Sequence, residues 1–138
     1  MIRRWFFPGV VFDTHAGPIF IGPEVTIRPN AVLVGPCWIS GGSTVSEGAV
    51  IRGLTVVGPD CRVGGEVGAT IFQGLSNKVH DGYLGDSIVG SWVNLGADTV
   101  SSNLLNTYGE ISVRLEPSGP RRRSGRMFLG AVIGDLSL

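Results

Sequence analysis

The side chains best suited to chemistry gather in one stretch of the sequence, residues 77–103. It contains Lys78, the only lysine of the chain, and His80, one of two histidines. A histidine can accept a proton near neutral pH, because its unperturbed pKa lies close to neutrality. Alternatively, His80 is a corner residue with satisfied hydrogen bonds and Lys78 an ordinary solvated lysine. The other histidine, His15, lies outside any motif and is interpreted as a surface residue.

A period of six residues predicts the elements that position this stretch. Every sixth residue from Ile21 to Val63 is Ile, Leu or Val, and the residue four positions after each is small or β-branched. This hexapeptide pattern predicts a parallel β-helix, an all-β solenoid with a triangular cross-section. Three hexads form a coil of about 18 residues, with the aliphatic side chain inward and the small one filling the corner. Ile21, Ile39 and Val57 are therefore expected to stack.

Composition and charge exclude several classes of protein. The 138 residues include 22 glycines, but hydrophobic residues make up 43% and charged residues only 16%, which argues against disorder. The glycines do not recur at every third position, which excludes collagen. Lys and Arg total 11 and Asp and Glu total 11, so no broad nucleic-acid interface is expected.

No apolar run is long enough to span a membrane, and a cytoplasmic location is the default expectation. The apolar N-terminal segment is broken by Pro8-Gly9 and lacks a signal-peptide cleavage site. We interpret it as a segment that packs onto an end of the fold.

Cys37 and Cys61 lack the spacing of a metal site, and no metal is expected. They occupy different corners in the hexad register, so we predict two unbridged core residues.

The repeat loses its phase at two places, 71–83 and 101–128, which mark extruded loops or irregular corners. The predicted organisation is an N-terminal cap segment over 1–16, main coils over 17–100, an extruded loop over 101–128 and a partial last coil over 129–138.

The open end of a β-helix exposes unpaired strand edges. The last residues fold over it, another chain covers it, or the sequence is a piece of a longer protein, which we favour.

The residues of the polar stretch also fall at the spacings of a known family's motifs. These motifs read K-x-x-H-x-x-Y-L-G-D, then V-N-I-G-A-G-T and S/C-N-Y. The residues at matching spacings are His80, Tyr83, Leu84, Gly85, Asp86, Val93, Asn94, Gly96, Ala97, Thr99 and Asn103. The chain thus resembles the acetyltransferase half of bifunctional N-acetylglucosamine-1-phosphate uridylyltransferases. A subgroup of sugar-nucleotidyltransferase-like proteins with W-V-N-L-G-A, here Trp92 to Ala97, is similar as well.

The resemblance implies a left-handed coil, a homotrimer, and transfer of an acetyl group from acetyl-CoA to the amine of a hexosamine 1-phosphate. His80 matches the general base. The positions matching substrate contacts are Lys78 as a phosphate anchor, Tyr83 and Asn94 at the sugar, and Asn103 near the reacting centre. The backbone N–H of Ala97 matches a cofactor contact. Arg121–Arg123 and Arg126 form either a solvated loop or a site for the phosphates of CoA.

Two other functions remain open at this point. One is a non-catalytic β-helix that trimerises or regulates a sugar-1-phosphate nucleotidyltransferase, with this chain as a fragment of it. The other is a module that binds a sugar phosphate without turnover. Acetylation, its loss on changing His80, and binding of acetyl-CoA separate the three.

Overall fold

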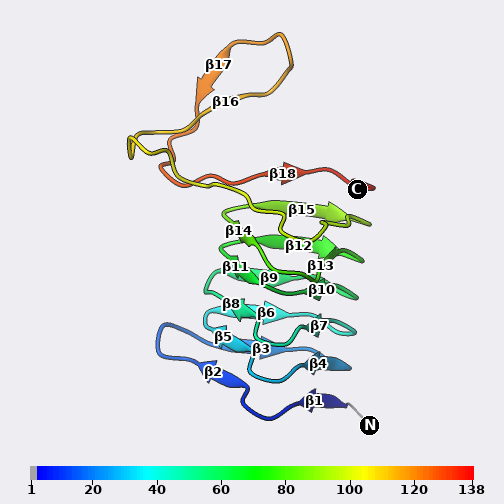
Figure 1. Ribbon diagram of the computed structural model, residues 1–138. Helices are drawn as coiled ribbons and strands as arrows, with labels where there is room; N and C mark the ends of the chain where they lie inside the picture. The colour runs from blue at the N-terminus through cyan, green and yellow to red at the C-terminus, as the bar shows by residue number, and fades with distance from the viewer. Residues whose placement is uncertain (1–2) are drawn as a thin grey trace.

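The computed structural model describes residues 3–138 and confirms the predicted parallel β-helix (Figure 1). Short strands follow one another around three sheets, so each of the first five coils contributes one strand to each sheet, and the last coil adds β18 (Val132–Ile133) to the third. Sheet A comprises β1 (Arg4–Phe6), β4 (Val25–Ile27), β7 (Thr44–Val45), β10 (Arg62–Val63) and β13 (Asn77–Lys78). Sheet B comprises β2 (Val11–Asp13), β5 (Val32–Val34), β8 (Val50–Ile51), β11 (Glu66–Gly68) and β14 (Tyr83–Gly85). Sheet C comprises β3 (Ile19–Ile21), β6 (Cys37–Ile39), β9 (Thr55–Val57), β12 (Ile71–Gly74), β15 (Ile88–Ser91) and β18 (Val132–Ile133).

The core is a set of columns inside the prism. Ile21 pairs with Ile39 and Ile39 with Val57, as the hexad register predicts. The small residues four positions on are buried as well, and Cys37 and Cys61 are buried free thiols, which confirms both predictions. Burial removes each aliphatic side chain from water, which favours folding by roughly 1.5–3 kcal/mol per residue. Among residues 3–138, no helix is long and apolar enough to cross a membrane.

The loss of the six-residue phase arises from a change in coil length. Ile39 and its partner Val57 are separated by three full hexads, but Val57 pairs with Phe72, which comes too early in the chain for that register. The next coil, from Phe72 to its partner Val89, is also shorter than three hexads. Segment 71–83 therefore contains β12, β13 and the start of β14, stacked in the prism with shortened turns between them. A period of six cannot follow coils of unequal length.

Paired strands begin earlier in the chain than the visible repeat. β1 pairs with β4 and β2 pairs with β5, so Arg4 to Asp13 already belong to a coil. Arg4 stands beside Val25, more than three hexads further along the chain, which places this first coil outside the hexad register. Residues 1 and 2 of the expected cap segment lie outside the described residues.

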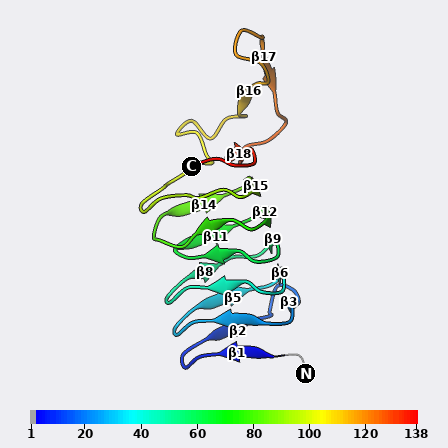
Figure 2. The same cartoon turned by 90° about the vertical axis from the view of Figure 1, so that its right-hand side faces the viewer.

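An arm is inserted into the last coil between sheets B and C. It contains β16 (Ser112–Arg114) and β17 (Arg121–Arg123), which form an antiparallel hairpin. An antiparallel bridge between Leu104 and Phe128 closes its base. Figures 1 and 2 show the arm projecting beyond the C-terminal end of the stack, after which the chain returns to pair β18 with β15.

Candidate functional site

His80 lies on the corner between sheets A and B, where β13 has ended and β14 has not begun. The carbonyls of this corner are held from several directions. The His80 carbonyl accepts a hydrogen bond from Lys78 Nζ at 2.9 Å. The carbonyl of Asp81 accepts one from the Asp98 N–H at 3.2 Å, and that of Gly82 accepts one from the Glu66 N–H at 3.3 Å. The corner backbone is therefore tied to the coils on both sides.

Glycine in the neighbouring coil makes the close approach of this corner feasible. Gly65 has φ +64°, in the left-handed region, and a Cβ there would lie 3.0 Å from both Asp81 Cα and the His80 carbonyl oxygen. The imidazole of His80 is exposed, and it makes no hydrogen bond or ion pair within residues 3–138. The sequence alternative of a side chain satisfied within the fold does not describe this arrangement. Neither ring nitrogen is engaged by a described residue, so both can meet a ligand.

Lys78 is directed into the prism and is only 1% exposed, so it is not a solvated lysine. It occupies the inward column of sheet A, above Val63. Its Nζ donates to the carbonyls of Gly64 at 3.0 Å and His80 at 2.9 Å. Burial lowers the pKa of Lys78, and the nearby Asp81 carboxylate partly counteracts this. Its role as a phosphate anchor stays a prediction. In the structure, the Lys78 ammonium stabilises the His80 corner from inside the prism through these two hydrogen bonds.

Tyr83, Asn103 and Asp86 form a hydrogen-bonded group, which we call the Tyr83 network. Asn103 Nδ2 donates to Tyr83 Oη at 3.0 Å and to Asp86 Oδ2 at 2.6 Å. Asn103 thus joins two residues that precede it by 20 and 17 positions. Gly85 makes room for the tyrosine, since a Cβ at Gly85 would lie 2.6 Å from Tyr83 Cζ and closer still to Oη.

The structure therefore brings together two of the substrate-contacting residues expected from sequence, and adds a third. The sequence gives Asp86 no substrate contact, although it ends the L-G-D part of the motif. Its carboxylate fixes the Asn103 amide by accepting one of its two N–H groups. The signal was present in the sequence, but only the coil stacking shows that the aspartate faces Asn103.

Asn94 and Ala97 lie on the next coil, and both are exposed. Asn94 forms a parallel bridge with Asn77, which continues sheet A. The N–H of Ala97 donates to no other group among the described residues, so it is available to a ligand carbonyl. Neither residue contacts the Tyr83 network through a hydrogen bond in this part of the chain.

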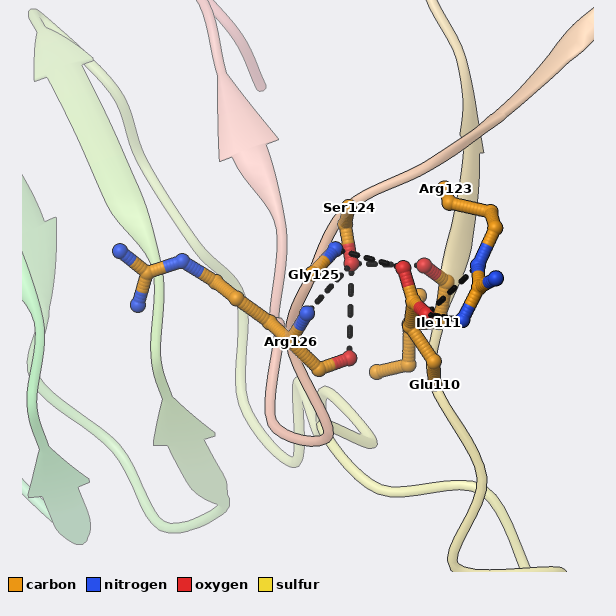
Figure 3. Close-up of polar contacts among 6 residues, drawn as sticks. All are labelled: Glu110, Ile111, Arg123, Ser124, Gly125 and Arg126. Carbon is orange, nitrogen blue, oxygen red and sulfur yellow. Dashed lines mark hydrogen bonds and ion pairs between the residues drawn. The ribbon is translucent and has the colours of Figure 1, made fainter.

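The arginine run forms β17 of the arm, and Figure 3 shows Arg123 together with Arg126. Arg123 pairs with Glu110, which also accepts a hydrogen bond from the Gly125 N–H at 2.7 Å. This lowers the pKa of Glu110, with the Arg123 hydrogen bond as the largest cause. Ser124 Oγ accepts from the Arg126 N–H at 3.1 Å, while the Arg126 side chain extends away from this cluster (Figure 3). Arg121 and Arg122 are exposed.

Arg126 instead lines a pocket of about 370 Å³ at the base of the arm. Asp86 of the Tyr83 network and the apolar side chains of Ile71, Ile88 and Phe128 also line it. Across residues 3–138, no group of three or more His, Cys, Asp or Glu side chains is arranged to hold a metal ion. The pocket offers one guanidinium, one carboxylate and an apolar wall, which suits a small organic ligand with charged groups.

Known proteins share this sequence over part of their length. The chain is 37% identical over 116 residues, 84% of its length, to a protein named bifunctional protein GlmU from Methanococcus vannielii, of which it spans 22%. It is 34% identical over 107 residues, 76% of its length, to one of the same name from a Cyanothece species, again 22% of that protein. It is 28% identical over 147 aligned residues, 96% of its length, to a bifunctional sugar-1-phosphate nucleotidylyltransferase/acetyltransferase from Sulfurisphaera tokodaii, of which it spans 36%.

No protein-family model matches the chain. The chain spans far less than two thirds of each of these relatives, so the identity refers to a segment of them. The matching part of this chain folds as a parallel β-helix that carries the Tyr83 network and the His80 corner. The chain is therefore a homologue of the bifunctional GlmU and nucleotidylyltransferase/acetyltransferase proteins, consistent with their acetyltransferase half.

Proposed function

We propose that this β-helix transfers an acetyl group from acetyl-CoA to the amine of a hexosamine 1-phosphate, with His80 as the general base. The observation that supports it most is the Tyr83 network, which joins two expected substrate contacts in one hydrogen-bonded group. The name of the Sulfurisphaera tokodaii relative includes an acetyltransferase, which is the same class of reaction. The amine attacks the thioester carbonyl, loses a proton to the base, and the CoA thiolate leaves.

The Tyr83 network gives Asn103 a defined part in this proposal. Both N–H groups of the Asn103 amide are engaged, by Tyr83 Oη and Asp86 Oδ2. The carbonyl oxygen of Asn103 is then the amide atom that remains for other groups, and it can accept a hydrogen bond from an N–H of the substrate amine. Such a contact would orient the nitrogen lone pair toward the thioester. Asn103 acts here as an orienting contact and His80 as the proton acceptor.

The remaining site residues complete the proposal. Acetyl-CoA is bound as cosubstrate, with its carbonyl accepting a hydrogen bond from the free Ala97 N–H. Asn94 contacts the sugar. Arg126, which points away from the arm's own polar cluster, is the arm arginine best placed to meet a phosphate. The protein acts in the cytoplasm as a homotrimer.

The test is an acetylation assay with glucosamine 1-phosphate and acetyl-CoA, which follows release of the free thiol. The variant His80→Ala should lose at least about a hundredfold in kcat, the low end of what a positioned general base contributes. The matched control is His15→Ala, which removes the chain's other histidine, an exposed residue of the turn after β2. Its rate should equal that of the wild type.

Other outcomes assign the chain to a different class. Equal rates for the wild type and His80→Ala would rule out His80 as the base. Saturable binding of the sugar phosphate without turnover would indicate a binding module. Absence of acetyl-CoA binding in calorimetry, together with no turnover, would indicate a structural or regulatory β-helix.

A further inference from the structure

Lys78 interrupts an aliphatic column inside the prism. The buried residues that stack in this column of sheet A are Ile27, Val45, Val63 and Lys78. Among residues 3–138, the Lys78 ammonium forms no ion pair, and its two hydrogen bonds go to backbone carbonyls. Burying a charge without a paired carboxylate is costly, and another aliphatic residue would continue the column without that cost. The lysine therefore requires a role that an aliphatic side chain cannot fill.

The corresponding corners of earlier coils show how a turn from sheet A to sheet B is closed. The corner between β4 and β5 and the corner between β7 and β8 have four residues each, as the His80 corner does. The fourth residue is Ala31 in one and Ala49 in the other, and both alanines are fully buried. The Ala31 N–H donates to the Arg28 carbonyl at 3.4 Å, and the Ala49 N–H donates to the Ser46 carbonyl at 3.3 Å. Each turn thus has its own closing hydrogen bond and a methyl group that fills its interior.

The His80 corner, residues 79–82, has neither feature. Its fourth residue is Gly82, with φ +119°, and a Cβ there would collide with the Thr99 carbonyl oxygen. An alanine therefore cannot fill this corner as it fills the other two. Within residues 3–138, the Gly82 N–H donates no hydrogen bond to the Val79 carbonyl, so the turn is not closed by its own backbone.

The Lys78 side chain supplies what this turn lacks. Its buried chain ends inside the corner, where Nζ donates to the His80 carbonyl at 2.9 Å. The same Nζ donates to the Gly64 carbonyl of the preceding coil at 3.0 Å. An aliphatic side chain has no donor for either carbonyl. The ammonium thus ties the turn to the preceding coil at His80 itself.

The His80 side chain has no hydrogen bond of its own to direct it. Its imidazole is exposed and makes no hydrogen bond or ion pair within residues 3–138. The place of the imidazole relative to a substrate therefore depends on the His80 backbone, whose carbonyl Lys78 holds. A catalytic group must be held to within roughly 0.5 Å of its productive position, so the support of this backbone matters for the rate.

We propose that Lys78 is a positioning residue for His80, and that its buried ammonium holds the corner backbone where the imidazole meets the substrate amine. Lys78 itself touches no substrate, because its side chain is only 1% exposed. The inference rests on the proposed function for the role of His80 as the base. It differs from the phosphate anchor that the resemblance implies, because an anchor requires Nζ to reach the substrate.

The test measures kcat and KM of the acetylation reaction for the full chain and for Lys78→Met, which removes the N–H groups and keeps a long unbranched side chain. A displacement of about 1 Å can cost about a hundredfold in rate. We therefore expect kcat to fall by roughly ten- to a hundredfold, and KM for glucosamine 1-phosphate to change by less than about threefold. The matched control is Leu33→Met, at a fully buried, inward position of β5. Its kcat should equal that of the wild type.

A double variant separates positioning from a general loss of structure. If Lys78 acts through His80, adding Lys78→Met to His80→Ala should change the residual rate by less than about twofold. In NMR spectra of Lys78→Met, the His80 ring signals should shift, and so should the Asp81 amide, whose nitrogen is bonded to the His80 carbonyl carbon. The His15 ring signals should stay. Circular dichroism and thermal melting establish that the variants keep the β-helix, and Lys78→Gln undergoes the same measurements if Lys78→Met does not fold.

Unchanged His80 and Asp81 signals in a folded Lys78→Met protein would overturn the inference. A full further loss of rate in the double variant would overturn it as well. A raised KM for the sugar phosphate at unchanged kcat would also overturn it, in favour of a phosphate anchor. A slow His80→Ala beside a Lys78→Met at the wild-type rate would refute this inference and leave the proposed function intact. A wild-type rate in His80→Ala would instead refute the proposed base, and the catalytic role of Lys78 with it.

Discussion

A single added methyl group at Gly85 should disrupt the Tyr83 network and leave the β-helix standing. In Gly85→Ala the new Cβ would lie 2.6 Å from Tyr83 Cζ and closer still to Oη. Non-bonded carbon contacts are comfortable only from roughly 3.5 Å, so the ring must move by about 1 Å. The phenol is the far end of a flexible side chain, so it moves while the paired backbone of β14 stays. The displacement breaks the 3.0 Å hydrogen bond to Asn103.

Two measurements follow from that displacement. Losing one neutral hydrogen bond costs about 0.5–1.5 kcal/mol, so the free energy of unfolding in urea should fall by about 1 kcal/mol. If the network orients the substrate, a shift of about 1 Å should lower kcat/KM by about a hundredfold. The chain has two tyrosines, so in a tyrosine-labelled NMR sample the Tyr83 ring signals should shift while those of the exposed Tyr108 stay.

The control for this variant is Gly134→Ala, because a Cβ there meets nothing within 4 Å. It should leave the Tyr83 signals and the stability unchanged. Unshifted Tyr83 signals in a folded Gly85→Ala protein would refute the placement of the ring over Gly85. Shifted signals with full activity would refute the network as part of the site.

Two further predictions concern buried titratable groups. Burial lowers the pKa of Lys78 in the folded state, so between that pKa and the unfolded value of 10.5 the unfolded chain binds more protons. The wild type should therefore gain stability relative to Lys78→Met as pH rises through this window, in urea titrations from neutral pH upward; a constant difference would contradict the buried ammonium. Burial also raises the pKa of Cys37 from 9.0 to about 11 and that of Cys61 in the same direction. Because the thiolate is the nucleophile, iodoacetamide at mildly alkaline pH should label Cys37 in the folded protein at least about a hundredfold more slowly than in urea, and equal rates would contradict its burial.

The hexad pattern predicted the inward columns because inward side chains and turn residues obey a local period. Ile21, Ile39 and Val57 stack as expected, and the cysteines are buried apart from each other. The pattern could not follow the coils once they became shorter than three hexads and unequal in length. Coil length depends on the turns, which carry no periodic side chain to read. The sequence was therefore compatible with a solvated Lys78. The structure instead places its side chain in an inward column above Val63.

Residue types at short, fixed spacings were enough to predict the fold class, to single out the polar stretch and to identify the family that the chain resembles. Which of those residues meet depends on how the coils stack, and no local spacing reports it. Asn103 reaches Tyr83 and Asp86 because about one coil of chain separates it from them. One coil returns the chain to the same side of the prism, so residues one coil apart become neighbours.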